Sequence, residues 1–304
     1  MSASLCNMKA ASRFIRQVSP ACPEPKSNLS PLEDPGNFTA IDEARRLFFR
    51  ELESQDVFDW FCQYRIVERR LGLEAANSLP NAPYPLAKWR ELVALARETV
   101  GRVDGDYELD CICTWLLEIY TLPGRCEARA GDVVLDCGAF TGNTSLYFAQ
   151  KVGPAGKVFA FEPIPSIFEK LKKNTAGVAN IKAIKAAVTG HSGVIDFEER
   201  GAGSYQSEFG SLEVKAVGID DFCRSTRLSR VDFIKMDIEG SEEAALRGAA
   251  ETIKRFRPRM ALSAYHKSVD IVNLPVLVHD LAPGYSFALR HGSNTKCETV
   301  LYCY

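Results

Sequence analysis

The stretch VVLDCGAFTG, residues 133–142, decides the fold. An apolar run typical of a buried strand leads into a turn with two glycines, and a helical pattern follows near 143–151. Gly138 allows a tight turn and a close approach of the backbone to a ligand, and Gly142 allows close helix packing. The helix that opens here would offer free N–H groups and partial positive charge. The stretch therefore predicts a strand–turn–helix unit that binds a ligand.

Strand-like and helical patterns alternate from residue 131 to the end of the chain. Continuous apolar strands that alternate with helices indicate a parallel sheet covered on both faces, and right-handed crossovers make it doubly wound. We expect a Rossmann-like, mostly parallel α/β sheet with an antiparallel edge strand formed near the C-terminus. The expected core strands are 132–137, 157–163, 181–188, 231–237 and 258–265, with helices near 143–151, 165–174 and 270–281 and from about 241, extra strands at 194–199 and 212–217, and a final antiparallel pair at 286–290 and 298–304.

The N-terminal part has a different character. Residues 1–40 include five prolines between positions 20 and 35 and predict a flexible arm. Residues 41–128 carry helical periodicity over about 41–70, 86–100 and 109–120, and we expect a helical extension there. The sheet domain then covers 129–304.

Composition places the chain among globular proteins. Its 304 residues suit about two structural units, with 46% apolar and 25% charged residues. The formal charge of −2 removes the electrostatic reason to expect a nucleic-acid partner. No apolar run reaches the roughly 18 residues of a membrane span, and no secretory signal is present. Residues 1–19 have a weak transit-like composition, but we expect a cytoplasmic protein without a membrane partner.

The ten cysteines are scattered, and no C-x-x-C pair supplies the usual zinc spacing. Several lie inside apolar runs, so we expect buried free thiols in a reducing compartment.

The turn follows the pattern D-x-G-x-x-x-G and not the dinucleotide fingerprint. Phe140 stands where that fingerprint requires a glycine against the pyrophosphate, which disfavours an NAD-type ligand. A ligand with an amino-acid tail fits better, and Asp136 would attract an ammonium group or order a water. Glu162 ends the second strand, twenty-six residues later, where a carboxylate accepts both hydroxyls of a ribose. Asp136 as a turn cap and Glu162 as a solvated acid are the alternatives.

Two further strand ends carry polar residues: Asp237 and Glu239 after the fourth, and Tyr265 and His266 after the fifth. Ligands of open parallel sheets bind beyond the carboxyl ends of the strands. We therefore expect these side chains to share one rim with Asp136 and Glu162.

These residues resemble the FkbM family of S-adenosylmethionine-dependent methyltransferases over roughly residues 129–304. The resemblance implies a class I methyltransferase fold and transfer of the S-adenosylmethionine methyl group to an acceptor oxygen of a sugar or another small molecule. It also implies a methionine-side loop (Asp136, Gly138, Ala139, Phe140 and Gly142), a ribose ligand (Glu162), a residue near the methionine tail (Asp237) and adenine contacts near 187–188. The matching stretches are VVLDCGAFTGNTS (133–145), KVFAFEP (157–163), VDFIKMDIEGSEEAALRGA (231–249), RPRMALSAYH (257–266) and the two C-terminal strands.

His266 is the first candidate for a general base, since an unperturbed histidine titrates near neutral pH; a structural histidine is the alternative. Glu239 is a second catalytic candidate, because with Asp237 it could hold a divalent cation and the acceptor hydroxyl. The alternative role for these acids is to stabilise the N-terminus of the next helix through its dipole. We prefer this role for Glu242 and Glu243 and leave it open for Glu239. A metal is therefore not favoured.

The remaining histidines have weaker claims. His291 could bind substrate or be solvated, and His191 and His279 are expected at the surface.

Other functions stay open. An N-methyltransferase that acts on bases would place an Asn/Asp-Pro-Pro-aromatic motif after the fourth strand, where Asp237-Ile238-Glu239-Gly240 stands. An NAD-linked oxidoreductase is disfavoured by Phe140. A non-catalytic S-adenosylmethionine-binding protein is the third alternative, because fold does not fix activity. The acceptor and the oligomeric state are not predicted.

Overall fold

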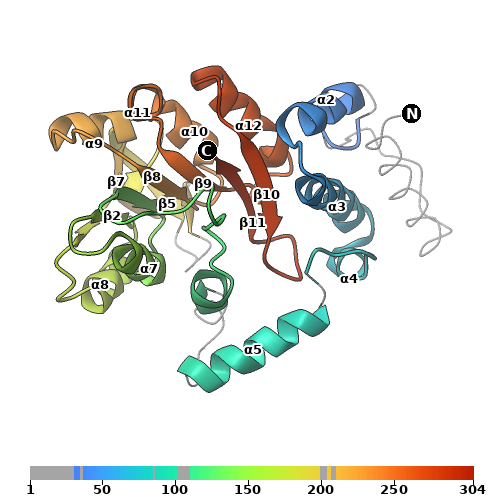
Figure 1. Cartoon of the computed structure of the whole chain (residues 1–304), viewed down its shortest axis with the longest axis horizontal. Coiled ribbons are helices and arrows are strands. Elements are labelled where there is room, and N and C mark those ends of the chain that lie inside the picture. The colour runs from blue at the N-terminus through green and yellow to red at the C-terminus, as the bar shows by residue number, and fades with distance from the viewer. Residues whose placement is uncertain (1–30, 35–36, 85, 101–109, 199–203, 207–209) are drawn as a thin grey trace.

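The computed structural model describes residues 31–34, 37–84, 86–100, 110–198, 204–206 and 210–304 (Figure 1). A seven-stranded sheet crosses the molecule in the order β10-β11-β9-β8-β1-β2-β3. Its strands are β1 (Val133–Cys137), β2 (Lys157–Phe161), β3 (Ile181–Ile184), β8 (Phe233–Met236), β9 (Arg259–Ser263), β10 (Phe287–His291) and β11 (Thr299–Cys303).

Strands β3, β2, β1, β8 and β9 pair in parallel, which confirms the doubly wound, mostly parallel sheet. The last two strands pair antiparallel, as expected. The antiparallel strand lies one position in from the edge, because the chain reaches the edge as β10 and then returns as β11 between β10 and β9.

The expected third strand, 181–188, is divided between two sheets. Its first half is β3 of the main sheet, and its second half pairs with β7 in a four-stranded sheet of order β4-β7-β5-β6. The predicted extra strands form an antiparallel pair there. The strands of this sheet are β4 (Ala187–Val188), β5 (Gly193–Glu198), β6 (Tyr205–Gln206) and β7 (Leu212–Val217).

Alternate residues of each main strand face opposite layers of helices. Leu135 packs into the core formed with α9–α12, whereas Val134 packs with Tyr147 and Phe148 of α7. This alternation buries both faces, as a parallel sheet requires. The helices are α7 (Asn143–Val152), α8 (Pro165–Asn174), α9 (Ile219–Ser225), α10 (Glu242–Arg247), α11 (Ala250–Phe256) and α12 (Asp270–Leu281).

The N-terminal helices share the core of the sheet. Phe58 and Phe61 of α3 belong to the same buried cluster as Leu289 and Leu301 of the last two strands. The helical pattern over 41–70 covers two helices, with a break at 49–51. These helices are α2 (Phe38–Phe48), α3 (Leu52–Leu71), α4 (Leu73–Asn77) and α5 (Leu86–Val100).

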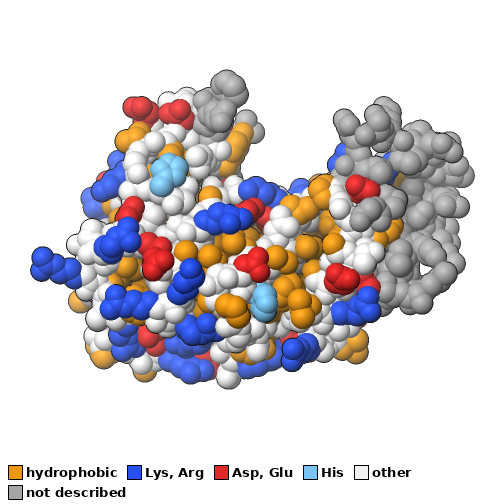
Figure 2. Space-filling model, turned by 90° about the horizontal axis from the view of Figure 1, so that it is seen from above, with side chains coloured by type: hydrophobic (Ala, Val, Ile, Leu, Met, Phe, Trp, Pro, Cys, Tyr) orange, Lys and Arg blue, Asp and Glu red, His pale blue; other side chains and the backbone are white. Residues whose placement is uncertain are grey.

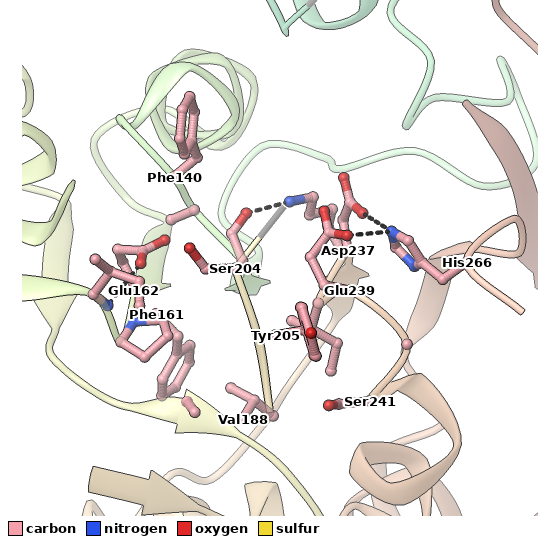
Figure 3. A pocket seen from close by; sticks show the side chains of 18 of the residues that line it. Phe140, Phe161, Glu162, Val188, Ser204, Tyr205, Asp237, Glu239, Ser241 and His266 are labelled. Atoms are coloured by element: carbon pink, nitrogen blue, oxygen red, sulfur yellow. Dashed lines mark hydrogen bonds and ion pairs between the residues drawn. The ribbon is translucent and has the colours of Figure 1, made fainter. Parts of the chain in front are cut away.

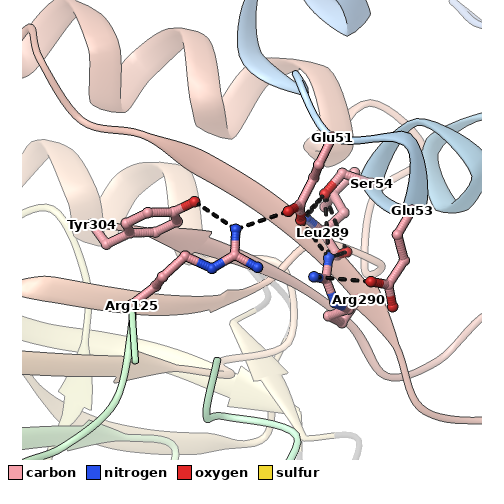
Figure 4. Close-up of polar contacts among 7 residues, drawn as sticks. All are labelled: Glu51, Glu53, Ser54, Arg125, Leu289, Arg290 and Tyr304. Atoms are coloured by element: carbon pink, nitrogen blue, oxygen red, sulfur yellow. Dashed lines mark hydrogen bonds and ion pairs between the residues drawn. The ribbon is translucent and has the colours of Figure 1, made fainter. Parts of the chain in front are cut away.

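Polar contacts fix α3 to strand β10 (Figure 4). The N–H group of Leu289 donates to Ser54 Oγ at 2.9 Å, and Arg290 donates to Glu51 at 2.6 Å. Arg125 binds the other oxygen of Glu51 at 2.8 Å. Partial burial raises the pKa of the Glu51 carboxyl group. Hydrogen bonds from Arg290, Arg125 and Ser54 outweigh this effect and lower the pKa to about 2. The carboxylate thus joins three segments of the chain.

Two expectations for the N-terminal part need revision. The helix expected over 109–120 is short where it is described, since it ends in a π-helical turn at Ile112–Leu116. Of the flexible arm expected over 1–40, residues 1–30, 35 and 36 lie outside the described residues, but Leu32 is buried and α2 begins at Phe38.

The surface and the cysteines agree with the composition. All eight cysteines that the structure describes are free thiols, and seven of them are buried. Figure 2 shows acidic and basic side chains interspersed over one face, without a field of a single sign. Within the described ranges, no helix combines the length and the apolar character that a bilayer crossing needs.

Candidate active site

A cavity of about 570 Å³ opens at the carboxyl ends of the parallel strands (Figure 3). The loop after β1, Glu162 after β2, Asp237 and Glu239 after β8, and His266 after β9 all line it. The predicted convergence of strand ends on one rim is therefore correct for Glu162, Asp237, Glu239, Tyr265 and His266, and wrong for Asp136. Asp136 and Gly142 do not line the cavity.

Asp136 is fully buried below the cavity and organises the loop. It accepts hydrogen bonds from the hydroxyls of Thr144 (2.8 Å) and Ser145 (2.6 Å) at the start of α7. Its other oxygen lies 3.4 Å from Lys235 Nζ. Asp136 is thus a support of the loop and lies out of contact with the cavity.

Lys235 is a site residue that the sequence analysis missed. Its side chain is 2% exposed, and its ammonium donates to the carbonyl of Gly138 at 2.5 Å. The register of β1 and β8 pairs Asp136 with Lys235, so both side chains lie on one face of the sheet. A lysine inside an otherwise apolar strand run is the signal that could have indicated this role.

The two glycines of the loop are required by close packing. Gly138 has φ +81°, and a Cβ built there would lie 1.8 Å from the carbonyl oxygen of Asp237. Gly142 has φ +101°, which disfavours any other residue, and a Cβ there would also lie 2.9 Å from the flexible end of the Leu171 side chain on α8, near the helix packing that the sequence predicted. Between them, Ala139 and Phe140 line the cavity, and Phe140 holds the left-handed φ of 47° that L residues rarely adopt.

Glu162 is buried beside this loop. It accepts a hydrogen bond from the N–H of Ile164 at 2.8 Å. Burial raises the pKa of Glu162 to about 7, although hydrogen bonds from the backbone of Ile164 and Phe140 oppose the shift. The carboxylate is held at a fixed place on the wall with acceptor capacity to spare.

Apolar side chains wall the cavity beside Glu162. Val188 lies where the resemblance implied adenine contacts, whereas Phe161, at the end of β2, was not singled out from the sequence; Figure 3 places both below Glu162. The four-stranded sheet adds Ile195, Ser204 and Tyr205, which the sequence analysis did not include. This half of the cavity is therefore walled mainly by apolar side chains around the carboxylate of Glu162.

The other half of the cavity is rich in acids. Asp237 accepts hydrogen bonds from Tyr120 (2.9 Å) and Tyr265 (3.2 Å). Burial raises the pKa of Asp237, but the positive charges of Lys235 and His266 outweigh burial, so the pKa is lowered. Glu298, which the sequence analysis missed, is buried here with φ 68°, and burial, with Asp237 and Asp110 nearby, raises its pKa to about 8.

His266 lies among three carboxylates. Its Nδ1 is 2.8 Å from Glu242, and its Nε2 is 3.4 Å from Asp237 and 3.5 Å from Glu239. Burial lowers the pKa of His266, but Glu242, Glu239 and Asp237 together raise it well above the usual value. A ring that already carries its proton is poorly suited to the general-base role that the sequence suggested.

Glu242 and His291 differ from the sequence-based expectations. Glu242 opens α10, but it is 1% exposed and faces His266, so it is more than a solvated helix-terminal acid. His291 is neither solvated nor at the cavity. It is buried in β10, bonded to Thr299 at 2.8 Å and packed on Trp60, and burial lowers its pKa to about 4. His191 is exposed as expected, whereas His279 is half-buried against Phe48.

The strand order and a site at the carboxyl ends of β1, β2 and β8 define the fold of a class I methyltransferase. The crystal structure of Methyltransferase FkbM from Methylobacillus flagellatus KT has the same fold, with a TM-score of 0.58 and 19% identity over 92% of this chain and 63% of that chain. Residues 136–281 match the Methyltransferase FkbM domain, and this part of the chain belongs to that family.

Two curated relatives are similar to this chain over part of their length. The 2-O-methyltransferase NoeI of Sinorhizobium fredii (strain NBRC 101917 / NGR234) is 26% identical over 147 residues, 41% of this chain and 60% of NoeI. The hexuronic acid methyltransferase AglP of Haloferax volcanii is 28% identical over 134 residues, 42% of this chain and 54% of AglP. The chain thus matches less than two thirds of either relative.

Proposed function

We propose that this protein is an S-adenosylmethionine-dependent O-methyltransferase whose acceptor is a hydroxyl of a sugar or another small molecule. The observation that carries the proposal is the division of one cavity into a nucleoside-like half around Glu162 and a polar half around Asp237. Membership in the FkbM methyltransferase family supports the reaction type.

The residues of the first half fit S-adenosylmethionine. A carboxylate accepts at about four lone-pair sites, so Glu162 retains capacity for two ribose hydroxyls after its backbone contacts. Phe161 and Val188 offer apolar walls for adenine, and the loop at Gly138–Phe140 would receive the methionine end. Phe140 leaves little room for a pyrophosphate, which supports this ligand over NAD.

S-adenosylmethionine would supply an electrophilic methyl group. The protein then has to align the acceptor oxygen with that methyl and exclude water. Tyr120 and Tyr265 fix the Asp237 carboxylate on the acceptor side, and the carboxylates of Asp237 and Glu239 can accept hydrogen bonds from acceptor hydroxyls. An oxygen acceptor is named for one relative, the 2-O-methyltransferase NoeI, and a sugar acid is named for the other, the hexuronic acid methyltransferase AglP.

Calorimetry with S-adenosylmethionine, S-adenosylhomocysteine and NAD tests the cofactor. We expect the first two to bind and NAD not to bind; the reverse order would overturn the proposal. Transfer of a radiolabelled methyl group to a panel of neutral and acidic sugars then tests the acceptor class. Binding without transfer to any hydroxyl compound would favour a non-catalytic binding protein.

A further inference from the structure

The acceptor half of the cavity contains a histidine with two differently placed nitrogens. Nδ1 of His266 is 2.8 Å from a carboxylate oxygen of Glu242, within ion-pair distance. Nε2 points the other way, toward the carboxylates of Asp237 and Glu239 (Figure 3). One side of the ring therefore lies close to a single carboxylate oxygen, and the other faces two oxygens across a wider gap.

The gap on the Nε2 side is too long for strong hydrogen bonds. The carboxylate oxygens lie at 3.4 and 3.5 Å, and neither ring nitrogen has a partner of hydrogen-bond geometry among the described residues, although the side chain is only 9% exposed. Two atoms that bind one metal ion at about 2.1 Å lie roughly 3.0–3.4 Å apart. The spacing around Nε2 is close to that of ligands that share an ion.

Glu242 is held where its carboxylate can position the imidazole of His266. It is 1% exposed and also accepts a hydrogen bond from the N–H of Ile238 at 3.0 Å. Metal-binding histidines usually donate their other N–H to a carboxylate, which fixes the tautomer and turns the free nitrogen to the metal. One oxygen of Asp237, one oxygen of Glu242 and one ring nitrogen of His266 lie within 4.8 Å of one another.

The charge of the group favours a bound cation. Three carboxylates surround one imidazole, and a cation at Nε2 would take the place of the proton that these carboxylates otherwise hold on the ring. The buried ammonium of Lys235 is shared with Asp136 and the carbonyl of Gly138. The backbone of Glu239 is also strained. Its φ of 52° is a left-handed value that costs a non-glycine residue energy.

We propose that Asp237, Glu239 and His266 Nε2 form a divalent-cation site at the acceptor end of the cavity, with Glu242 as the residue that positions His266. Two carboxylate oxygens and one imidazole suit an ion such as Mn²⁺, with its other positions left for water or acceptor hydroxyls. The sequence alone favoured no metal; the position of Glu242 behind His266 is what changes this assignment.

The proposed role of the ion rests on the proposed function. An ion at this place would bind the acceptor hydroxyl and lower its pKa, and the proton would pass to solvent. The oxygen could then form its bond to the methyl carbon as the bond from that carbon to sulfur breaks. This removes the need for His266 to act as a base.

Metal binding can be measured without cofactor or acceptor, so its failure is distinguishable from failure of the proposed function. Tag-free full-length protein is treated with EDTA, dialysed and titrated with MnCl₂, with free Mn²⁺ followed by electron paramagnetic resonance. We expect one site per chain. E239Q should weaken it at least tenfold, and E242Q by about 10–100-fold through the orientation of His266.

The matched control is E243Q, which removes the neighbouring acid of the same helix, one that is paired with Arg247 on the surface. It should bind Mn²⁺ like the unchanged protein. Equal Mn²⁺ binding by E239Q and the unchanged protein, with both folded by circular dichroism, would overturn the site. Full methyl transfer after EDTA treatment would overturn its role in activating the acceptor.

Discussion

The α-carbon of Gly138 faces the main-chain carbonyl of Asp237 so closely that no side chain fits between them. The two residues directly follow the adjacent parallel strands β1 and β8. Each lines a different half of the cavity. Their contact therefore sets the distance between the cofactor loop and the acceptor-side carboxylates.

Gly138→Ala should separate these two loops. A Cβ would lie 1.8 Å from the Asp237 oxygen and would adopt an unfavourable φ of +81°. We expect S-adenosylmethionine affinity to fall at least tenfold in calorimetry. Gly153→Ala is the control, because its φ of +65° imposes similar strain but a Cβ there meets no described atom within 4 Å. Equal affinity of the two variants would contradict the explanation.

Lys235→Met should destabilise the protein by about 3–5 kcal/mol, the usual effect of removing one partner of a buried ion pair. The change leaves Asp136 without its ammonium neighbour and the Gly138 carbonyl without a donor. Urea unfolding measures the effect. Lys182→Met, at an exposed position of β3, should change stability by less than about 0.5 kcal/mol. A similar small change at Lys235 would count against the buried pair.

The affinity for S-adenosylmethionine should rise with pH between 6 and 8. Burial raises the pKa of Glu162 to about 7, so the carboxylate that accepts the ribose hydroxyls forms across this range. The gain should approach about tenfold, the change expected for one ionisation spread over two pH units around its pKa. Glu162→Gln should weaken binding and flatten the profile. A pH dependence that persists in this variant would assign it to another group.

The contribution of His291 to the free energy of unfolding should decrease as the pH falls from about 6.5 toward 4, while the raised pKa values of Glu162 and Glu298 contribute in the opposite direction. Burial lowers the pKa of His291 to about 4, so the unfolded chain binds a proton in this range that the folded protein excludes. The loss approaches about 1.4 kcal/mol per pH unit for one proton. In denaturant titrations at pH 7 and 5, the difference in stability between the unchanged protein and His291→Gln should shift against the unchanged protein as the pH falls, whereas the difference from His191→Gln, at an exposed position, should stay constant.

Local sequence was sufficient for the elements whose signals lie within a few residues. The helices at 165–174 and 270–281 have the predicted limits, and Pro165 at the first helical position explains one of these starts. The turn at Gly138 and the acid after β2 were likewise found from their neighbours. These features depend on backbone preference and apolar spacing, which a short window contains.

The missed residues depend on distant partners. Lys235 becomes a support for the loop only when β8 lies beside β1, which brings it to Asp136 across the sheet. Glu242 becomes buried only because the chain after β9 brings His266 over the start of α10. The division of 181–188 likewise follows from β7, which pairs with β4 from the far side of an intervening hairpin. No local pattern records these contacts.

The hydrogen bond from Leu289 to Ser54 has a consequence for self-association. β10 is the outermost strand on its side of the sheet, and the main-chain groups along such a border can recruit a strand from another molecule. Helix α3 lies against this border, and Ser54 takes up one of its outward N–H groups. A shortened chain that starts after residue 71 would uncover the border and would be prone to aggregate, however well its methyltransferase half was preserved.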